Sequence, residues 1–290
     1  MSEEESCHAL IIPLFGDLPS DLREYLNLLH STGYQLVLVD NRADELGITQ
    51  HQPCWPSEAY VIENRNRGGL AGGLNCGIAA AIARGADYVT LLDQDSRMQP
   101  EHLQGLQRQL HSTEWDQARR LLIGPCIWDA DRRCWHSPRQ RSADSNSTKT
   151  TLLITSGTTF CASNWPLLGR FDEAMQIDYI DHDWCFRAAT KGFSLHQVHD
   201  CILSQHFGEP HPNALCDLLG MQLYTPYRHF TALRNLRLLL RRPYIPISIK
   251  IKEVIKMLLK LPAWLLFEPQ RAANLHSIYT AVTCPLKLQA

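Results

Sequence analysis

The chain has 290 residues, of which 44% are hydrophobic and 20% are charged, so it is a globular protein and not an intrinsically disordered one. With 28 Lys and Arg residues against 30 Asp and Glu residues, the formal net charge is -2, and the overall charge gives no reason to expect nucleic-acid binding. The ten cysteines are scattered without zinc-ligand spacing, and we predict free thiols in a reducing compartment. The acidic amino terminus does not resemble a signal peptide, so we expect a cytoplasmic location.

The first hundred residues alternate short β-rich runs with helical patterns. Strands are predicted over residues 8–15, 34–40, 59–64 and 87–93, with a helix after Asp21 and another over 74–85. This alternation is typical of an α/β fold of the nucleotide-binding type, in which a mainly parallel sheet is flanked by helices. The first helix is expected to bury four side chains that share one face, namely Leu22, Tyr25, Leu26 and Leu29.

The second half continues this pattern less regularly. We expect a helix from Pro100 to about Arg120, strands over 121–128 and 151–157, and a polar surface loop over 137–150. A short helix over 182–192 then precedes the last strands, over 193–206.

From about Tyr244 the composition changes, and 247–261 form a basic amphipathic helix. Its apolar face contains Ile247, Ile251, Val254, Leu258 and Leu261, and the opposite face contains Lys252, Lys256 and Lys260. Together with the following run AWLLF, such a helix can lie in the headgroup layer of a membrane. Alternatively, it packs on the parent domain with its lysine face in solvent. No run reaches the ~18 apolar residues that are needed to cross a bilayer.

Two carboxylates, Asp93 and Asp95, follow the predicted strand 87–93. Ligands of open α/β sheets bind beyond the carboxyl ends of the strands, so both side chains are expected to face the crevice. The pattern Asp-x-Asp offers hard oxygen ligands that can hold Mg²⁺ or Mn²⁺ against a diphosphate. The alternative is an Asx-turn that ends the strand.

A second acidic group, with Asp181 and Asp183, lies where the helix 182–192 begins. Asp181 could be the N-cap of this helix, or Asp183 could be a first-turn acid that the positive end of the helix dipole favours. An Asp at a helix amino end is also held ionised, so capping is compatible with service as a proton acceptor. His206, after the last strand, is either a polar strand-end residue or a third metal ligand.

The glycine-rich run 64–77 follows a strand and opens a helix. Backbone N–H groups at such a point favour a phosphate. Asp93 lies about 20 residues after Gly73, as the acid of a dinucleotide-binding unit does. An NAD-dependent oxidoreductase is therefore an alternative, although the run lacks G-x-G-x-x-G and the strand ending in Asp40 would have no role.

Six segments in order resemble the family-2 glycosyltransferases with a GT-A fold, and among them the bacterial rhamnosyltransferases of O-antigen and cell-wall polysaccharide assembly. Residues 224–242 also resemble the segment that follows the catalytic domain in that subgroup. The six segments are VLVDN (37–41), the run ending in Asn75-Cys76-Gly77, LLDQDS (91–96), ITSG (154–157), FDEAMQIDYIDHDWCFRA (171–188) and SQHFG (204–208).

By position, the resemblance implies a nucleotide site in the first half of the chain. Asp40 and Asn41 would contact the base or ribose of the nucleotide. Asn66 and Asn75 would line the rest of the nucleotide pocket.

The resemblance also implies the reacting groups. Asp93 and Asp95 would form the metal-binding D-x-D for Mg²⁺ or Mn²⁺, with His206 as a further ligand. Asp181 would be the catalytic base. The family usually has Glu where this chain has Asp183, and we regard Asp183 and Trp184 as candidates for acceptor contact. For Trp184 the alternative is a position in the core.

The implied activity is inverting transfer of a sugar, with L-rhamnose from dTDP-L-rhamnose favoured, onto a saccharide acceptor. Residues 1–243 would be the GT-A domain and 244–290 a basic helical extension. That extension suggests a lipid-linked acceptor and peripheral contact with the cytoplasmic face of the inner membrane through 247–267.

Two other classes stay open at this point. A sugar-phosphate nucleotidyltransferase should carry Arg and Lys directly after the first strand, where this chain has no basic residue before Arg23. A catalytically silent glycan-binding or nucleotide-binding scaffold would need no proton acceptor.

Overall fold

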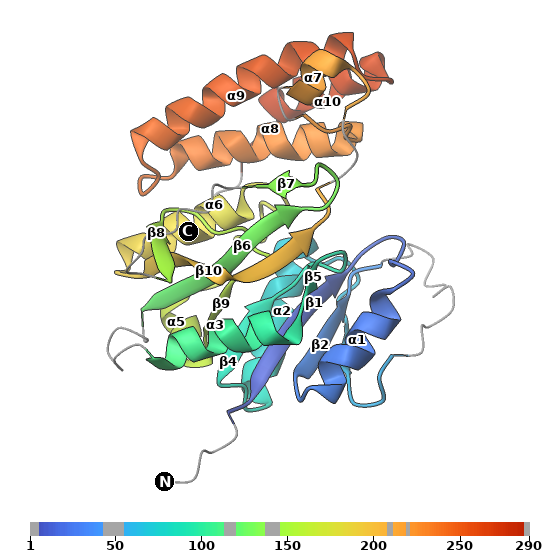
Figure 1. The fold of residues 1–290 in the computed structure, drawn as a ribbon. Coiled ribbons are helices and arrows are strands. Elements are labelled where there is room, and N and C mark those ends of the chain that lie inside the picture. Colours follow the sequence, from blue (N-terminus) through green and yellow to red (C-terminus); the bar gives the residue numbers. More distant parts are fainter. Residues whose placement is uncertain are drawn as a thin grey trace.

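The computed structural model describes residues 6–42, 55–112, 120–136, 146–207, 211–218 and 221–286. A central sheet separates two groups of helices, and helices from the carboxyl-terminal part of the chain form a further layer at one end of the molecule (Figure 1). The strands follow the order β3-β2-β1-β4-β9-β6-β10-β5, while β7 pairs with β6 and β8 with β10. They are β1 (His8–Leu14), β2 (Gln35–Asp40), β3 (Tyr60–Glu63), β4 (Tyr88–Leu91), β5 (Arg97–Met98), β6 (Leu121–Asp129), β7 (Cys134–Trp135), β8 (Ser147–Thr150), β9 (Thr159–Cys161) and β10 (Ser194–Gln205).

The predicted α/β class with a mainly parallel sheet is confirmed. Strands β1 to β4 are parallel to their neighbours among themselves, and β10 runs parallel to β6. Strand β9 lies antiparallel between β4 and β6. The helices are α1 (Leu22–Ser31), α2 (Gly69–Ala83), α3 (Pro100–Ser112), η1 (Ala162–Asn164), α5 (Trp165–Leu168), α6 (Ile180–Thr190), α7 (Ala214–Leu218), α8 (Pro226–Arg241), α9 (Ile247–Leu266) and α10 (Arg271–Thr283).

Strand β1 is buried along its whole length because helices cover both faces of the sheet. Successive side chains of a strand point to opposite faces. Ile11 therefore joins the core formed with α2, whereas Leu10 and Ile12 join the core formed with α1 and α3.

Two helices show how local sequence sets this packing. In α1 all four predicted apolar positions are buried, as expected. Helix α2 lies so close to the sheet that a Cβ on Gly77 would come within 2.4 Å of Ile11 Cγ2, and a Cβ on Gly73 within 2.5 Å of Asn41 Nδ2. Helix–sheet packing thus explains Gly73 and Gly77 of the glycine run.

Three predicted elements differ from the structure. No strand forms over 151–157, and the strand of this region is β9 at Thr159–Cys161. The run 193–206 forms one strand, β10, whose register shifts between Val198 and Ile202. The predicted loop 137–150 ends in β8, while its residues 137–145, like 113–119 of the predicted helix 100–120, lie outside the described residues. Local propensity does not show which run finds a strand partner, and this explains the errors.

The helical layer is formed by α8, α9 and α10, which share one buried apolar cluster with Phe186 of α6. Its centre includes Leu236 and Leu239 of α8, Met257 and Trp264 of α9. Helix α8 thus packs with the extension, and a division at residue 243 separates helices with a common core. Residues 287–290 of the predicted extension lie outside the described residues.

Helix α9 packs on this layer through an unexpected face. Glu253, Met257 and Trp264 are buried, whereas Ile247 and Leu258 of the predicted apolar face are exposed. The alternative that α9 packs on the domain is confirmed, and Lys252 and Lys256 are exposed, but the face that packs is not the predicted apolar one. Trp264, in the run expected at a membrane interface, stacks on the His229 ring at 4.0 Å instead.

Among the described residues, no helix combines the length and the hydropathy that a membrane span requires. Nine cysteines of the described residues are free thiols.

Candidate active site

Asp93 and Asp95 lie just beyond the end of β4, and Gln205 links them. The Gln205 side-chain amide, at the end of β10, donates to Asp93 Oδ2 at 3.4 Å and to Asp95 Oδ1 at 3.3 Å. Ser156 braces the same turn, because its Oγ accepts from Asp93 N at 3.0 Å. Sequence reasoning missed Gln205 and Ser156, although both lie in motifs it identified, SQHFG and ITSG.

The electrostatics show that a third carboxylate belongs to this group. Burial raises the pKa of Asp93 to about 7, helped by the negative charge of Asp95 and, to a smaller extent, of Asp181. Burial also raises the pKa of Asp95, against the charge of His206. We call Asp93, Asp95 and Asp181 the acidic cluster. It unites the ends of β4 and α6, which are about 90 residues apart in sequence.

Asp181 is the second residue of α6 and is paired with its neighbour. The backbone N–H of His182 donates to Asp181 Oδ1 at 2.8 Å, and His182 Nδ1 lies 2.9 Å from the same oxygen. Burial alone would raise the pKa of Asp181, but the charge and hydrogen bonds of His182 hold that pKa below its ordinary value. In turn, the Asp181 carboxylate raises the pKa of His182, although burial acts the other way. Asp181 is therefore ionised at neutral pH.

The segment before α6 has a strained backbone. Gln176, Asp178 and Tyr179 have φ angles of 61°, 57° and 62°, a left-handed conformation that costs of order 1–3 kcal/mol for each non-glycine residue. Such strain persists only where surrounding contacts fix the backbone. The Gln176 carbonyl also accepts from Ala71 N at 3.0 Å, so this N–H of α2 is not available to a phosphate as the sequence suggested.

Helix α8 supplies the contacts that hold this segment. Asn235 Nδ2 donates to the carbonyls of Met175 at 2.7 Å and Asp178 at 3.0 Å. The Asp178 carboxylate accepts from Arg228 at 2.8 Å and from Thr231 at 2.7 Å. Asp181 thus receives its position from a helix in the carboxyl-terminal layer.

Asp183 and Trp184 are turned into the core, so the expectation of acceptor contact is wrong and the alternative of a core position for Trp184 is confirmed. Asp183 is 1% exposed, and its carboxylate is bonded by Tyr244 Oη and lies 3.3 Å from Arg242 Nε. Trp184 is 2% exposed and stacks on Phe171, while its Nε1 donates to the Gly169 carbonyl at 2.9 Å. Both side chains are structural because they are turned into the core.

Two of the predicted nucleotide ligands are also buried. Asn41 accepts from Asn64 Nδ2 at 2.7 Å, which ties the end of β2 to the turn before α2. Asn75 is fully buried, where its amide donates to the Phe171 carbonyl and its Oδ1 accepts from Phe171 N at 2.8 Å. The prediction that Asn41 and Asn75 contact the nucleotide is therefore wrong. Asn64 was missed, although it stands at the head of the glycine-rich run.

Asp40 and Asn66 remain accessible. Asp40 ends β2, and Arg42 Nε donates to its Oδ1 at 3.0 Å. Burial opposes ionisation, but the Arg42 hydrogen bonds and charge hold the pKa of Asp40 below its ordinary value. Asn66 is exposed in the turn before α2, with a φ of 51°. Asp40 lies at the same sheet edge as Asp93, because β2, β1 and β4 are parallel neighbours.

The predicted three-residue metal site is not assembled. His206 is exposed, and its Nδ1 pairs with Asp131 Oδ1 at 2.8 Å, although its charge still acts on Asp95. No group of three or more His, Cys, Asp or Glu side chains that could hold a metal ion occurs in the described residues. Asp93 and Asp95 nevertheless fit a divalent cation, because two hard, mutually repelling carboxylates are what such an ion stabilises.

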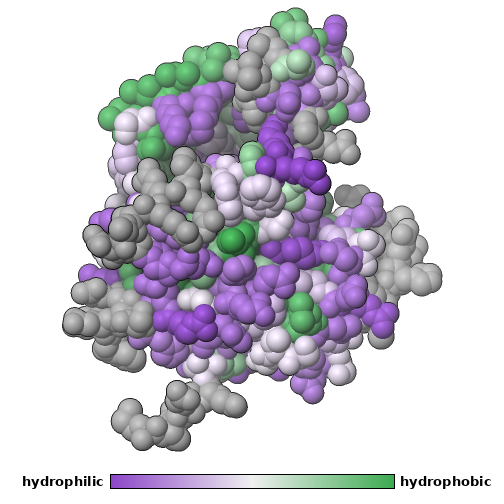
Figure 2. Space-filling view, in the orientation of Figure 1, coloured by the Kyte–Doolittle hydropathy of each residue, from purple (hydrophilic) through white to green (hydrophobic). Residues whose placement is uncertain are grey.

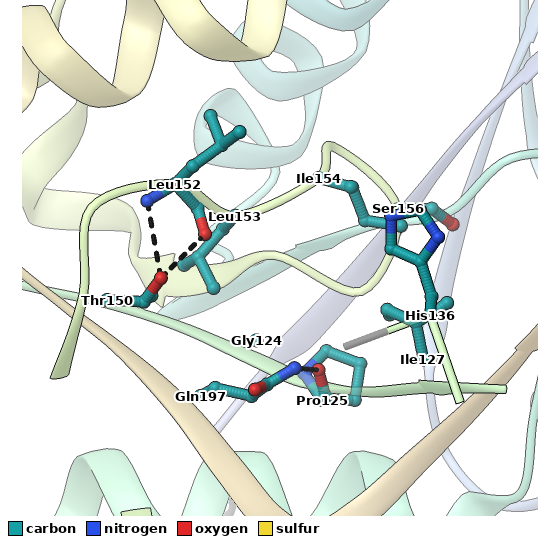
Figure 3. A pocket seen from close by; sticks show the side chains of 10 residues that line it. All are labelled: Gly124, Pro125, Ile127, His136, Thr150, Leu152, Leu153, Ile154, Ser156 and Gln197. Atoms are coloured by element: carbon teal, nitrogen blue, oxygen red, sulfur yellow. Dashed lines mark hydrogen bonds between the residues drawn. The ribbon is translucent and has the colours of Figure 1, made fainter. Parts of the chain in front are cut away.

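A cavity of about 220 Å³ adjoins the acidic cluster at Ser156 (Figure 3). It lies between β6 and the segment 150–156, with apolar walls from Pro125, Ile127 and Leu153. His136 points into it and Gln197 lies at its base. A ligand in this cavity would therefore have both apolar and polar contacts beside Asp93.

Comparisons with known proteins show which family this chain resembles. The family profile described as "Glycosyl transferase family 2" matches residues 9–161, just over half of the chain. A curated relative, "dTDP-rhamnosyl transferase RfbF" from Shigella flexneri, is 25% identical over 264 residues, which are 86% of this chain and 84% of the relative.

Solved structures show the fold alone, since their sequence identities are low. The crystal structure of GalNAc-T7 with UDP, GalNAc and Mn2+ matches 88% of this chain with a TM-score of 0.58 and 14% identity. That of S. aureus TarS matches 91% with a TM-score of 0.50 and 13% identity. The chain spans 55% and 44% of those two proteins. These likenesses support the GT-A type of α/β architecture.

Proposed function

The chain belongs to glycosyl transferase family 2, and from that premise we propose that it moves an L-rhamnosyl unit from dTDP-L-rhamnose to a saccharide acceptor of a surface polysaccharide such as O-antigen. The choice of donor is supported by the relative whose name states that it is a dTDP-rhamnosyl transferase, since the similarity covers most of both chains. The family also disfavours the oxidoreductase and the nucleotidyltransferase.

One observation carries the proposal: Asp93, Asp95 and Asp181 share one neighbourhood although they come from distant parts of the chain. A glycosyl transfer with inversion needs a group that stabilises the leaving diphosphate and a base that accepts the proton of the attacking hydroxyl. The acidic cluster offers both services within one site.

Asp181 is proposed as the base. His182 keeps its carboxylate ionised, and His182 engages Oδ1, so we assign the acceptance of the acceptor's hydroxyl proton to Oδ2. General base catalysis of this kind contributes typically ~10²–10⁴-fold. The hydroxyl oxygen then forms the new bond to the anomeric carbon as the bond to the diphosphate breaks, so no covalent enzyme intermediate is needed.

Asp93 and Asp95 are proposed to hold Mg²⁺ or Mn²⁺, with His206 as a further ligand if it leaves Asp131. When bound, such an ion offsets the negative charge on the leaving diphosphate. Gln205 and Ser156 orient the two carboxylates through the hydrogen bonds described above. Asp40 and Asn66 are proposed to contact the nucleotide, because both are accessible and Asp40 lies at the same edge of the sheet.

The acceptor is proposed to be lipid-linked and to be met at the cytoplasmic face of the inner membrane. The support is the basic amphipathic helix over 247–267 within the extension 244–290, which follows the glycosyltransferase domain proposed over 1–243. With Asp183 and Trp184 buried, the cavity beside Ser156 is our candidate for contact with the acceptor sugar.

The proposal is tested by release of dTDP from dTDP-L-rhamnose in the presence of membrane extracts that contain lipid-linked saccharides. We expect release that needs both the extract and a divalent ion, and that is abolished by excess chelator. A panel of other nucleotide sugars tests the donor. No release with any donor, despite binding of the nucleotide, would leave the silent scaffold as the better description. Full release in excess chelator would remove the metal from the proposal.

A further inference from the structure

The outer surface of the helical layer is unusually apolar. In the described residues, eleven large apolar side chains are more than half exposed, and nine of them lie on α9 and α10. They are Ile247, Ile251, Ile255, Leu258, Leu259 and Leu266 of α9, with Leu275, Tyr279 and Val282 of α10. Figure 2 shows the α9 part as a hydrophobic band along the upper left edge of the molecule. We call these nine residues the outer ridge.

The six side chains from α9 form one stripe. At about 100° per residue, they fall within an arc of about 120°. On the same wheel, Lys252 and Lys256 border one edge of the arc and Lys250 borders the other. The apolar stripe is therefore flanked by positive charge on both sides.

The acidic residues of the extension do not lie on the outer ridge. Between Tyr244 and Leu286 the sequence has two acidic residues, Glu253 and Glu268, and both are buried. Glu253 faces the domain, where it accepts from Tyr179 Oη at 3.3 Å. Glu268 pairs with His229 Nε2 at 2.6 Å. The charges left on the outer surface of α9 and α10 are consequently positive.

We infer that the outer ridge docks on an anionic phospholipid bilayer, with its apolar side chains at the acyl boundary and its lysines among the lipid phosphates. An apolar stripe flanked by lysines is the pattern of helices that lie in the membrane interface. A second copy of the chain fits this surface poorly, because a symmetric contact would set the lysines of one copy against those of the other.

Helix α9 connects the outer ridge to the candidate active site. The inner side of α9 carries Glu253, which contacts Tyr179, two residues before Asp181. A helix with its side chains is about 10 Å thick. Docking would thus hold the catalytic segment about one helix diameter above the bilayer. The binding itself needs no glycosyltransferase activity, and only its purpose rests on the proposed function.

The test is flotation of the full-length protein with vesicles of phosphatidylglycerol and phosphatidylethanolamine, compared with vesicles of phosphatidylcholine. We expect binding to the anionic vesicles that weakens with salt. The double variant I251E/L258E should lose at least ten-fold in binding. Its matched control is L28E/L167E, which places the same charges on exposed leucines of α1 and α5. K250Q/K252Q should weaken binding about five-fold for each lysine, equivalent to about 1 kcal/mol per basic residue near an anionic surface.

Several results would overturn the inference. They are no flotation of the wild-type protein, equal binding to neutral vesicles, or equal loss in L28E/L167E. Light scattering that shows a wild-type dimer and an I251E/L258E monomer would assign the ridge to a second copy. Flotation as expected without dTDP release under any condition would keep the membrane surface and reject the proposed function.

Discussion

Two groups of carboxylates include residues near the start of α6, and they differ in how their charge is compensated. In the acidic cluster, Asp93 and Asp95 share a neutral amide, and Asp181 has a single histidine. In the second group, which we call the arginine clamp, Asp178 is paired with Arg228, and Asp172 and Asp183 with Arg242. Full pairing gives the clamp a structural role, whereas the incomplete pairing of the cluster is consistent with the cation and the proton that we propose for it.

The neighbours Asp181 and Asp183 show the difference most directly. They are two residues apart on one helix, yet Asp183 is 1% exposed among Arg242, Arg187 and Tyr244. We therefore propose that the motif has one acid for chemistry, Asp181, and one for structure, Asp183. The following predictions test this division, from the largest expected effect to the smallest.

Replacing each of these two acids by its amide should have opposite consequences. We expect D181N to lower transfer ~10²–10⁴-fold with little change in stability, because the base is lost. D183N should cost about 2–4 kcal/mol of stability, because Arg242 and Arg187 both lose a buried carboxylate, although Arg242 keeps its pair with Asp172. Chemical denaturation and dTDP release measure the two effects. Near-normal turnover in D181N would remove Asp181 from the mechanism, and a stable D183N would contradict its scaffold role.

The variant Asn235→Ala tests whether contacts from helix α8 near the arginine clamp position Asp181. Loss of its bonds to the carbonyls of Met175 and Asp178 should cost about 2–4 kcal/mol. It should also lower kcat at least ten-fold with an unchanged donor KM, because the strained segment no longer fixes Asp181. The matched control is N274A on α10, where a buried Asn makes similar bonds to Trp264 and Pro269. We expect it to lose stability but not kcat, and equal kcat losses would indicate a general effect of destabilisation.

The stability of the protein at acid pH should depend on His8, which lies outside both the acidic cluster and the arginine clamp. His8 is buried and bonded to Thr90 Oγ1 at 2.7 Å, and burial lowers its pKa from 6.5 to about 4. Because the folded pKa is depressed, this stability is fully present above pH 6.5 and is lost as the pH falls through about 4. The loss is about 3 kcal/mol at ~1.4 kcal/mol per unit. Denaturation of H8Q across this range should show a flatter curve. An unchanged slope would assign the acid loss to other groups.

Metal binding tests the proposed role of Asp93 and Asp95 in the acidic cluster. With dTDP present, Mn²⁺ or Mg²⁺ at 100 times its Kd should stabilise the wild-type protein by up to about 2.7 kcal/mol. D93N and D95N should lose this gain, while E101Q, which changes an exposed acid on α3, should keep it. Thermal unfolding with and without the ion measures the difference. Equal stabilisation of D93N would show that the ion binds elsewhere.

The sequence predicted much of the fold and the three carboxylates of the acidic cluster. The buried strand of β1, the apolar face of α1 and the end of β4 follow from local patterns of 2 and 3.6 residues. These periods do not indicate which segments pair as strands, so the strand at 159–161 was not predicted. The motifs also indicated Asp93, Asp95 and Asp181, because acids at the carboxyl ends of strands and the amino ends of helices lie where an α/β sheet binds ligands. An Asx-turn and a helix cap were the structural alternatives that the sequence left open for them.

Only the tertiary structure decided which polar residues face the site. Asn41, Asn75, Asp183 and Trp184 looked like ligands in sequence, yet their partners come from distant segments and turn them into the core. The same holds for α9, whose sequence defines an apolar face and a basic face. Contacts of Glu253 and Trp264 decided that the apolar one points outward. Sequence fixes the periodicity of a helix, but its rotation depends on what packs against it.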